Sequence, residues 1–276
     1  MTVAQDTSRA QTPVDPFAAP APGPVPSRPR LLSYLGRWGR ARRWLSPHAL
    51  RVLDVGCAFG YGAAAVAARG PAGRVVVGVE RDPEHLEMAA RSFPWLKILD
   101  ADAAELPVPD ACADAVLLLD VMEHVAAPER VLAEAHRVLR PRGALIVSVP
   151  HDGPLRGLDA LNLYQGLRRR RPSLPPLEAA THSDSGTHNH YSVGELEALL
   201  SPWFTVHRVA RTGLGLQELV TLALLVIRIP LRAPGVARAL LPVHLLAYLF
   251  DDLIPSGPLA YHVAVAAWRR DPADAR

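Results

Sequence analysis

Residues 51–62 read RVLDVGCAFGYG, and this stretch decides the interpretation of the fold. The apolar run 52–55, which includes Asp54, breaks into glycine-rich chain and then into the alanine-rich residues 63–68. This order predicts a buried strand, a tight turn and the first turns of a helix. Glycines in the turn let the backbone approach a ligand, and the helix N-terminus directs unpaired N–H groups at the same place. A turn with backbone donors and a carboxylate suits a ligand with polar hydroxyl groups and a positive centre.

Composition limits the classes of protein that remain. A chain of 276 residues can hold one large domain, or one domain with an elaborate appendage, and 49% hydrophobic residues support a sizeable core. The formal charge of +3 does not indicate a nucleic-acid-binding surface.

Cys57 and Cys112 are too few for a disulfide framework and are unsuited to a zinc site by spacing. The first thirty residues contain no apolar run of the kind that a secretory signal needs. We therefore expect a reducing, cytoplasmic setting.

Short apolar runs alternate with helical patterns along the rest of the chain. Further strands are predicted at 74–80, 96–99, 114–120, 143–149, 203–210 and 261–268, with helices at 82–91 and 128–139. Nearly continuous apolar strands that alternate with helices indicate an α/β fold with a doubly wound, parallel sheet covered on both faces. Ligands of such sheets bind beyond the carboxyl ends of the strands. Because Asp54, Glu80, Asp102 and Asp120 all fall at or just after such ends, they predict a shared crevice.

Five segments carry a resemblance to a known family. They are VLDVGCAFGYG (52–62), GVERDPEHLEMA (78–89), DADAAELPVPD (100–110), DAVLLLDVMEHV (114–125) and LAEAHRVLRPRGALIVSVP (132–150). Together they resemble the class I S-adenosylmethionine-dependent methyltransferases, particularly the branch that includes ubiquinone- and menaquinone-biosynthesis and other small-molecule C- and O-methyltransferases. Ala58 stands where the family often has glycine, and Arg142-Gly143 replaces a frequent Gly-Gly. Neither departure removes an acidic ligand contact.

The resemblance implies a fold and a cofactor. The fold would be a Rossmann-like sheet of seven strands, mostly parallel with an antiparallel last strand, plus helical insertions. The cofactor would be S-adenosylmethionine, with Glu80 accepting hydrogen bonds from both ribose hydroxyls and Arg81 and Asp82 beside it. Other implied contacts are Asp54, Gly56, Ala58 and Gly60 at the methionine portion, Asp102 and Ala103 at the adenine, and Asp120, Val121 and His124 near the sulfonium and the acceptor.

The implied activity is transfer of a methyl group, by O- or C-methylation, to a small acceptor that is apolar or lipid-linked. Alignment of the reacting atoms should supply most of the acceleration. An acceptor hydroxyl or acidic carbon also needs a base, and histidine titrates in the useful range. The candidates are His124, His151, His188 and His190; we favour His124, although a histidine bonded to backbone at a helix start is the structural alternative. A non-catalytic S-adenosylmethionine-binding protein of the same fold is the rival function.

A nicotinamide-dependent dehydrogenase is the nearest enzymatic rival, because it also has a glycine turn and an acidic residue at a strand end. Its fingerprint is G-x-G-x-x-G. Here the corresponding positions hold Gly56, Ala58 and Tyr61, so two of the three glycines are missing. We therefore disfavour this class.

The domain organisation follows from shifts in composition. Residues 1–30, rich in proline and alanine, predict a disordered tail ahead of a methyltransferase domain at 31–276 with its core at 50–150. Apolar residues at helical spacing in 31–45 predict a helix packed on the domain. Its arginines, Arg37, Arg40, Arg42 and Arg43, are expected to point outward, either as a solvated face or as a phosphate-binding patch.

An insertion is expected at 151–191. Leucines from Leu155 to Leu167 predict a short amphipathic helix that ends in the arginines 168–171, which suit the helix dipole, or an anionic substrate or lipid head group. The run 182–190 gathers His182, Asp184, His188 and His190, but part of it matches the family's lead-in to the next helix, so we expect no metal. Ser192 and Glu195 predict a capping box for that helix.

A second, apolar insertion is expected at 213–256, between the last two strands. Its runs LQELVTLALLVIRI (216–229) and VARALLPVHLLAYLF (236–250) fall short of the ~20 residues that span a bilayer. Three alternatives remain open: a lid over the substrate pocket, a dimer interface, or interfacial helices at a membrane surface. The membrane alternative implies peripheral association through 216–250 and a lipid-linked or isoprenoid acceptor. We expect no nucleic-acid partner, because no basic patch is interleaved with aromatic residues.

Overall fold

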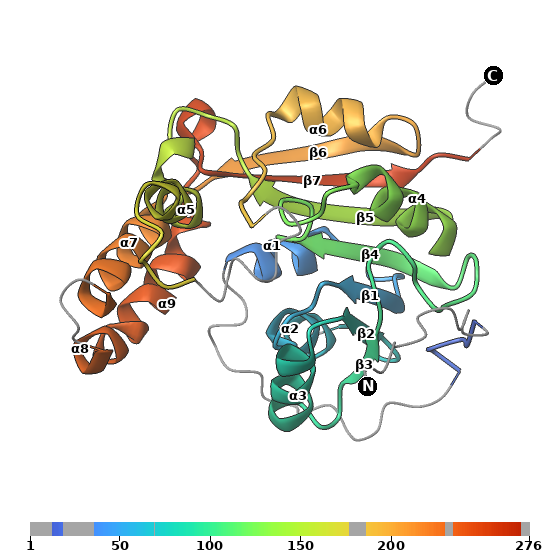
Figure 1. Cartoon of the computed structure of the whole chain (residues 1–276). Helices are drawn as coiled ribbons and strands as arrows, with labels where there is room; N and C mark the ends of the chain where they lie inside the picture. Colours follow the sequence, from blue (N-terminus) through green and yellow to red (C-terminus); the bar gives the residue numbers. More distant parts are fainter. Residues whose placement is uncertain (1–12, 19–35, 69, 177–185, 230–233, 272–276) are drawn as a thin grey trace, which may run out of the picture.

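A single seven-stranded sheet organises the protein in the computed structural model, which describes residues 13–18, 36–68, 70–176, 186–229 and 234–271 (Figure 1). The strand order is β3-β2-β1-β4-β5-β7-β6. Strands β1 to β5 pair in parallel, whereas β7 is antiparallel to both β5 and β6. The predicted Rossmann-like, mostly parallel sheet with an antiparallel last strand is confirmed. The strands are β1 (Arg51–Val55), β2 (Val75–Glu80), β3 (Lys97–Asp100), β4 (Ala113–Leu119), β5 (Leu139–Pro150), β6 (Phe204–Thr212) and β7 (His262–Arg269).

Helices cover both faces of the sheet because alternate residues of each strand point in opposite directions. Leu117 of β4 belongs to a buried cluster with α1 and α2, whereas its neighbour Leu118 belongs to a cluster with α4 and α6. This doubly wound arrangement is the one that the uninterrupted apolar strands predict. The α-helices of the described residues are α1 (Gly36–Trp44), α2 (Tyr61–Ala67), α3 (Pro83–Ser92), α4 (Pro128–Val138), α5 (Ala160–Arg170), α6 (Val193–Leu200), α7 (Leu216–Arg228), α8 (Pro234–Ala239) and α9 (Leu241–Asp251).

Local capping explains where several helices begin. The side chain of Asp82 accepts hydrogen bonds from the backbone N–H groups of Glu84 and His85 at 2.9 and 3.0 Å, and so starts α3. Ser192 and Glu195 form the predicted capping box of α6. The capping of α3 matters for the site, because it fixes the chain directly after Glu80.

The amino-terminal tail is described only at residues 13–18, and the remainder of the predicted tail lies outside the described residues. Phe17 packs against the core, Lys97 donates to the carbonyl oxygen of Pro16 at 2.8 Å, and Asp15 lies 3.6 Å from Arg51. Residues 13–18 therefore depart from the predicted disordered tail and lie against the edge of the sheet.

The prediction that the arginines of α1 point outward is wrong for Arg37 and Arg40, which are 5% and 7% exposed. The Nε of Arg37 donates to the buried carboxylate of Asp252 at 3.0 Å, and its guanidinium also forms an ion pair with Asp120. Arg40 donates to the carbonyl oxygen of Asp252 at 2.5 Å and to the hydroxyl of Thr212 at 3.0 Å. Helical periodicity could not reveal these partners, because Asp252 is distant in sequence.

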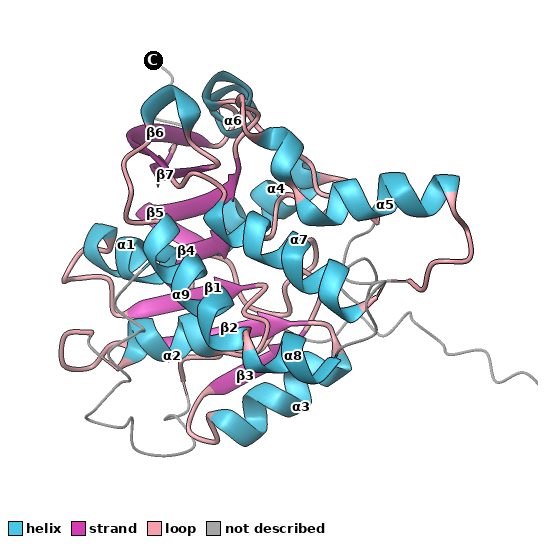
Figure 2. Ribbon diagram, turned by 90° about the vertical axis from the view of Figure 1, so that its left-hand side faces the viewer, coloured by secondary structure: helices cyan, strands magenta, loops and turns pink. Residues whose placement is uncertain are grey.

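The apolar insertion forms α7, α8 and α9, which lie together at one end of the sheet next to α1 and α5 (Figures 1 and 2). Thr221 of α7 lies within 3.0 Å of His244 of α9, and Tyr248 of α9 packs against Trp38 and Arg37 of α1. Within the described part of the chain, no helix has the length and apolar character needed to cross a membrane.

The insertion leaves and rejoins the sheet at neighbouring points. The backbone N–H of Gly213 donates to the carbonyl oxygen of Ile254 at 3.0 Å, and the N–H of Tyr261 donates to the carbonyl oxygen of Gly213 at 2.9 Å. As a result, β6 and β7 pair as an antiparallel hairpin, with one register shift between Val206 and Arg208, although the helices lie between them in sequence.

We predict that Arg37→Met lowers the free energy of unfolding by about 3–5 kcal/mol, because it leaves a buried carboxylate without its cation. Denaturant unfolding followed by circular dichroism measures this change. Arg43→Met, at an exposed position of the same helix, is the matched control and should change stability by less than about 0.5 kcal/mol. Equal losses in the two variants would contradict the structural role of Arg37.

Candidate functional site

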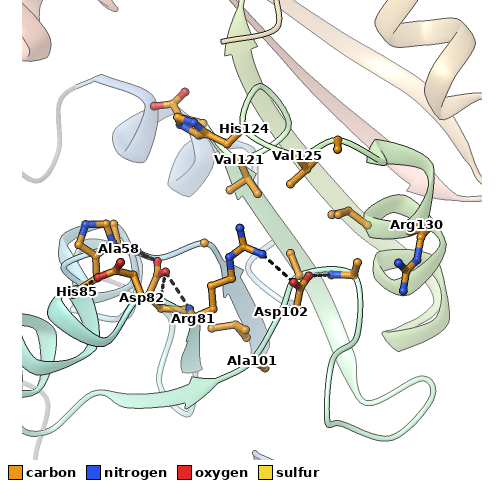
Figure 3. A pocket seen from close by; sticks show the side chains of 18 of the residues that line it. Ala58, Arg81, Asp82, His85, Ala101, Asp102, Val121, His124, Val125 and Arg130 are labelled. Carbon is orange, nitrogen blue, oxygen red and sulfur yellow. Dashed lines mark hydrogen bonds and ion pairs between the residues drawn. The ribbon is translucent and has the colours of Figure 1, made fainter. Parts of the chain in front are cut away.

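A cavity of about 490 Å³ lies at the carboxyl ends of β1, β2 and β4 (Figure 3). It is the crevice that the acidic residues at the strand ends predict. Its lining residues come from four places: the turn after β1 (Gly56 and Ala58), the end of β2 and the start of α3 (Val79–Pro83 and His85), the loop after β3 (Ala101–Ala104), and the segment from β4 into α4 (Asp120, Val121, His124–Ala127, Arg130 and Val131).

Glu80 is the best-positioned acid of the cavity. Its Oε2 accepts a hydrogen bond from the N–H of Ala58 at 2.9 Å, and its Oε1 accepts from the N–H groups of Arg81 and Asp82 at 2.9 and 3.0 Å. Burial alone raises the pKa of this carboxyl, but His85 and the three backbone donors outweigh burial and lower the pKa to about 2. Glu80 is therefore ionised at neutral pH and fixed in position, with further lone pairs for a ligand's hydroxyl groups.

The turn after β1 brings backbone close to the cavity. A Cβ at Gly56 would lie 2.4 Å from the side chain of Val121, so that position accepts only glycine. Ala58, the departure from the family's glycine, has a φ of 45°, in the left-handed region that disfavours side chains. The hydrogen bond from Ala58 to Glu80 helps to hold this strained conformation.

Asp54 and Gly60 do not line the cavity. Asp54 is 3% exposed and lies below the turn, where it accepts a hydrogen bond from the backbone of Ala63 at the start of α2. Burial raises its pKa to about 7, and the negative charge of Glu80 adds to this shift. Gly60, with a φ of 78°, precedes α2 and packs near Leu96. Both residues pack on the side of the turn that faces away from the cavity. They are therefore not placed to make the predicted contacts with the methionine portion of the cofactor in this cavity.

Arg81, Asp102 and Ala103 line the cavity as predicted. Arg81 reaches across to Asp102, with 2.9 Å between its Nη1 and Oδ2 (Figure 3). The other carboxylate oxygen of Asp102 accepts from the N–H of Ala104 at 2.8 Å. Because both ionic side chains are half exposed, this pair contributes little to stability, and Arg81 can move aside for a ligand.

Asp120 and His124 stand on the opposite side of the cavity, at the end of β4. Asp120 has a φ of 59°, and its Oδ1 accepts from the hydroxyl of Ser148 at 3.0 Å. The ion pair with Arg37 holds its other oxygen. A non-glycine residue with this φ is strained, and these two partners keep its carboxylate at the cavity wall.

The remaining candidate histidines lie beyond His124, outside the cavity lining. The ring centroids of His124 and His188 are 4.8 Å apart in an edge-to-face contact. The Nδ1 of His188 lies 2.8 Å from Oδ2 of Asp159, and the Nε2 of His190 lies 3.2 Å from the same oxygen. Burial lowers the pKa of His188, but the contact with Asp159 outweighs it and raises the pKa overall. His151 is 9% exposed beside the end of β5 and is separate from this group.

Sequence reasoning missed two buried acids next to these histidines. Asp159 is fully buried, and its side chain also caps α5 by accepting from the N–H of Asn162 at 2.7 Å. An aspartate just before a helix is a recognisable capping signal, so the sequence does indicate the capping role of Asp159. Glu123 is 3% exposed, and burial raises its pKa to about 7. Nothing in its position within the sequence indicated that it would be buried.

The possible metal cluster at 182–190 is only partly described. His182 and Asp184 lie outside the described residues, and His188 and His190 both face Asp159. No group of three or more histidine, cysteine or acidic side chains is arranged to hold a metal ion in the described ranges.

The cavity lies within a segment that resembles known proteins. Residues 53–147 match the family model described as "Methyltransferase domain". A Mycobacterium tuberculosis protein named "Probable S-adenosylmethionine-dependent methyltransferase" is 38% identical over 100 residues, which cover 36% of this chain and 35% of that protein. Residues 53–147 contain the turn, Glu80 and the Asp120–His124 segment. Residues 53–147 form a class I S-adenosylmethionine-dependent methyltransferase domain.

Further relatives and structures agree with the methyltransferase domain. Demethylmenaquinone methyltransferase of Thermus thermophilus is 34% identical over 129 residues, covering 42% of this chain and 58% of the relative. A solved structure of an S-adenosylmethionine-dependent methyltransferase from Thermotoga maritima aligns with a TM-score of 0.54 at 18% identity, covering 84% of this chain and 87% of that one. The latter shows a shared fold. The chain spans only about a third of the length of the M. tuberculosis relative.

S-adenosylmethionine, the predicted cofactor, is confirmed by these matches. The methyltransferase domain also fits this molecule on its own geometry. Glu80 presents an ionised, fixed carboxylate for two adjacent hydroxyl groups, and Gly56 leaves room where any side chain would collide. Asp102 and Ala103 border the part of the cavity next to Glu80, and Asp120 borders the far end, where a positive centre would be stabilised.

We predict that Glu80→Ala weakens binding of S-adenosylmethionine by at least about 100-fold. Two hydrogen bonds to a charged group are worth about 1.5–3 kcal/mol each, and about 1.4 kcal/mol is a factor of ten in affinity. Isothermal titration calorimetry measures the change. Glu87→Ala, on the exposed side of α3, is the control and should bind as the wild type does. Unchanged affinity in Glu80→Ala would refute the ribose role.

We predict a change in pH dependence for Asp54→Asn. The folded pKa of about 7 lies above the ordinary value of 3.8, so the stability associated with this group is complete below pH 3.8 and is lost as pH rises through 7. The free energy of unfolding of the wild type should therefore fall by about 2–3 kcal/mol between pH 5 and pH 8 because of Asp54, and this contribution should be absent from the variant. Urea unfolding at both pH values measures the difference. Asp100→Asn, at an exposed strand end, should follow the wild type; parallel curves for Asp54→Asn would contradict the buried, neutral carboxyl.

Proposed function

We propose that this protein is a methyltransferase that moves a methyl group from S-adenosylmethionine to an oxygen or carbon of a small, apolar acceptor. The observation that carries the proposal is the arrangement of one cavity, with fixed Glu80 at one end and Asp120 and His124 at the other. The first end suits the ribose of the cofactor, and the second suits the positive sulfur and the acceptor. A binding protein without turnover would need the first end only.

The main task of the protein in this reaction is to align the acceptor atom, the methyl carbon and the sulfur. S-adenosylmethionine supplies a methyl group that is already activated on a sulfonium. The acceptor's oxygen or carbon forms a bond to the methyl carbon as the carbon–sulfur bond breaks, the electron pair stays on sulfur, and the acceptor's proton leaves to a base. Holding the reactants in line is worth about 7–11 kcal/mol, and Asp120 is rigid enough to contribute because Arg37 and Ser148 fix its carboxylate.

We assign the role of base to His124, since it is the one of the four candidate histidines that lines the cavity. Its neighbour His188 acts through it as a positioning residue. Asp159 holds His188 through Nδ1, and Asn162 holds the backbone of His188 through hydrogen bonds of 2.9 Å in both directions. The edge-to-face contact then restricts the orientation of the His124 ring.

The nature of the acceptor is supported from two sides. The insertion carries apolar helices at the end of the sheet where His124 and Asp120 lie, and the Thermus relative acts, by its name, on demethylmenaquinone. Neither observation depends on the other. Both favour an acceptor with a substantial apolar part.

Incorporation of a labelled methyl group tests the function directly. The full-length protein is incubated with methyl-labelled S-adenosylmethionine and, separately, with organic-solvent and aqueous extracts of cells. Label in a product of the organic extract is the expected result. Label only in the aqueous extract would overturn the apolar acceptor, and label in neither, with cofactor binding intact, would favour the non-catalytic alternative.

We predict that His124→Gln lowers kcat by about 100-fold to 10,000-fold, the usual contribution of a general base, while cofactor affinity stays within about twofold of wild type. Asp159→Asn should lower kcat less and shift the pH–rate profile, because it disturbs only the positioning of His188. Steady-state kinetics on the labelled product provides both values. His48→Gln, at an exposed loop position, is the control. A kcat for His124→Gln equal to that of His48→Gln would exclude His124 as the base.

A further inference from the structure

The helices of the apolar insertion leave large apolar side chains on the surface. On α7, Leu219 and Val226 are 47% and 53% exposed, and on α9, Leu246 and Phe250 are 47% and 51% exposed. Their spacing, seven residues on α7 and four on α9, places each pair along one side of its helix. Tyr248 and Leu249 of α9 pack inward near α1, whereas Leu241, Val243 and Leu245 of the same helix are also 54%, 48% and 41% exposed. Both helices thus leave much of their apolar surface exposed.

The charges of this surface have one sign. Between Leu214 and Phe250 the only acidic residue is Glu218, and it accepts the backbone N–H of Ala160 at 2.9 Å in a largely buried position. The next acids, Asp251 and Asp252, are each 1% exposed. Arg228 at the end of α7 and Arg238 in α8 are exposed. Among the described residues of α7, α8 and α9, the exposed apolar side chains therefore share their helices with exposed cations and with no exposed carboxylate.

The neighbouring helix α5 also carries positive charge. It contacts α7, with the N–H of Ala160 at its amino-terminal end donating to Glu218, and its other end carries the exposed arginines 169–171 (Figure 2). No acidic residue occurs between Ala160 and Pro176. The exposed leucine, valine and phenylalanine side chains, together with Arg228 and Arg238, define what we call the insertion face, carried by α7, α8 and α9.

An anionic lipid bilayer is the occupant that this chemistry fits. A second copy of the chain would bring the same arginines against each other, because a symmetric interface pairs like patches, and the insertion face offers no carboxylate to compensate them. Apolar side chains bordered by arginine match the acyl and headgroup layers of an anionic membrane. Helices of 13 and 11 residues, α7 and α9, are too short to cross a bilayer but can lie in its interface.

We infer that the insertion face docks on anionic lipid bilayers, with Leu219, Val226, Leu246 and Phe250 in the interface and Arg228 and Arg238 on lipid headgroups. The docking does not depend on the proposed methyl transfer. It has a consequence for the cavity, since Asp252 follows α9 directly and pairs with Arg37, which pairs with Asp120. The docked helices are thereby connected to the acceptor end of the cavity.

Flotation of the full-length protein with vesicles tests the inference. Vesicles of phosphatidylcholine with one third phosphatidylglycerol should carry the protein to the top of the gradient, and vesicles of phosphatidylcholine alone should carry much less. Arg228→Gln with Arg238→Gln should weaken binding roughly 30-fold, because each arginine near an anionic surface contributes about 1 kcal/mol. Leu246→Glu with Phe250→Glu should abolish flotation.

Matched controls separate docking from misfolding. Met88→Glu, at a 43% exposed position on α3, should float as the wild type does. All variants should keep wild-type affinity for S-adenosylmethionine by calorimetry, so that a loss of flotation cannot come from unfolding. Absence of wild-type flotation on anionic vesicles would overturn the inference, and so would a dimer in sedimentation equilibrium that Leu246→Glu with Phe250→Glu dissociates. Neither result would bear on methyl transfer, which the labelling experiment measures independently.

Discussion

The buried charge group around Arg37 is the constraint on which much of the structure depends. This one guanidinium pairs with Asp252 after α9 and with Asp120 at the cavity, and it lies 4.7 Å from the ring centroid of Tyr248. Burial alone raises the pKa of Asp252, yet Arg37 and its neighbours hold it at about 2, so the group stays charged inside the protein. Buried ions need partners in fixed geometry, and this need locks the first helix, the insertion and the cavity wall into one arrangement.

The cavity shows a second kind of preorganisation, made from backbone. Glu80 accepts three N–H groups from the turn after β1 and from the entry to α3, so a single carboxylate joins two loops. Those loops would otherwise have to be ordered when the cofactor binds, at a cost in conformational entropy. Asp54 supports the same turn from below, and burial raises its pKa to about 7. Two acids on neighbouring strands thus have pKa values shifted in opposite directions and have complementary tasks.

The mostly parallel sheet and the cavity edge could be predicted from sequence, because apolar runs and strand-end acids are local signals. The capping box at Ser192 and the cavity positions of Glu80, Asp102 and Asp120 follow from the same kind of signal. The orientation of Arg37 and Arg40 could not be predicted, because their partners at Asp252 and Thr212 are far away in sequence. Glu123 was missed for a related reason: only tertiary packing makes a carboxyl beside His124 buried.

The hydrogen bonds that join Gly213 to Ile254 and Tyr261 make the insertion a closed appendix of the β6–β7 hairpin. Because its two ends already meet, lengthening or replacing the segment between them adds little to the entropic cost of closing the loop. Natural variation can therefore change the length and the surface of the helical segment while the sheet and the Glu80 site stay intact, as long as an acid remains to pair with Arg37. The β6–β7 hairpin is thus a fixed attachment point for a variable segment. Replacement of that one segment in evolution could change the partner or the compartment of such a protein.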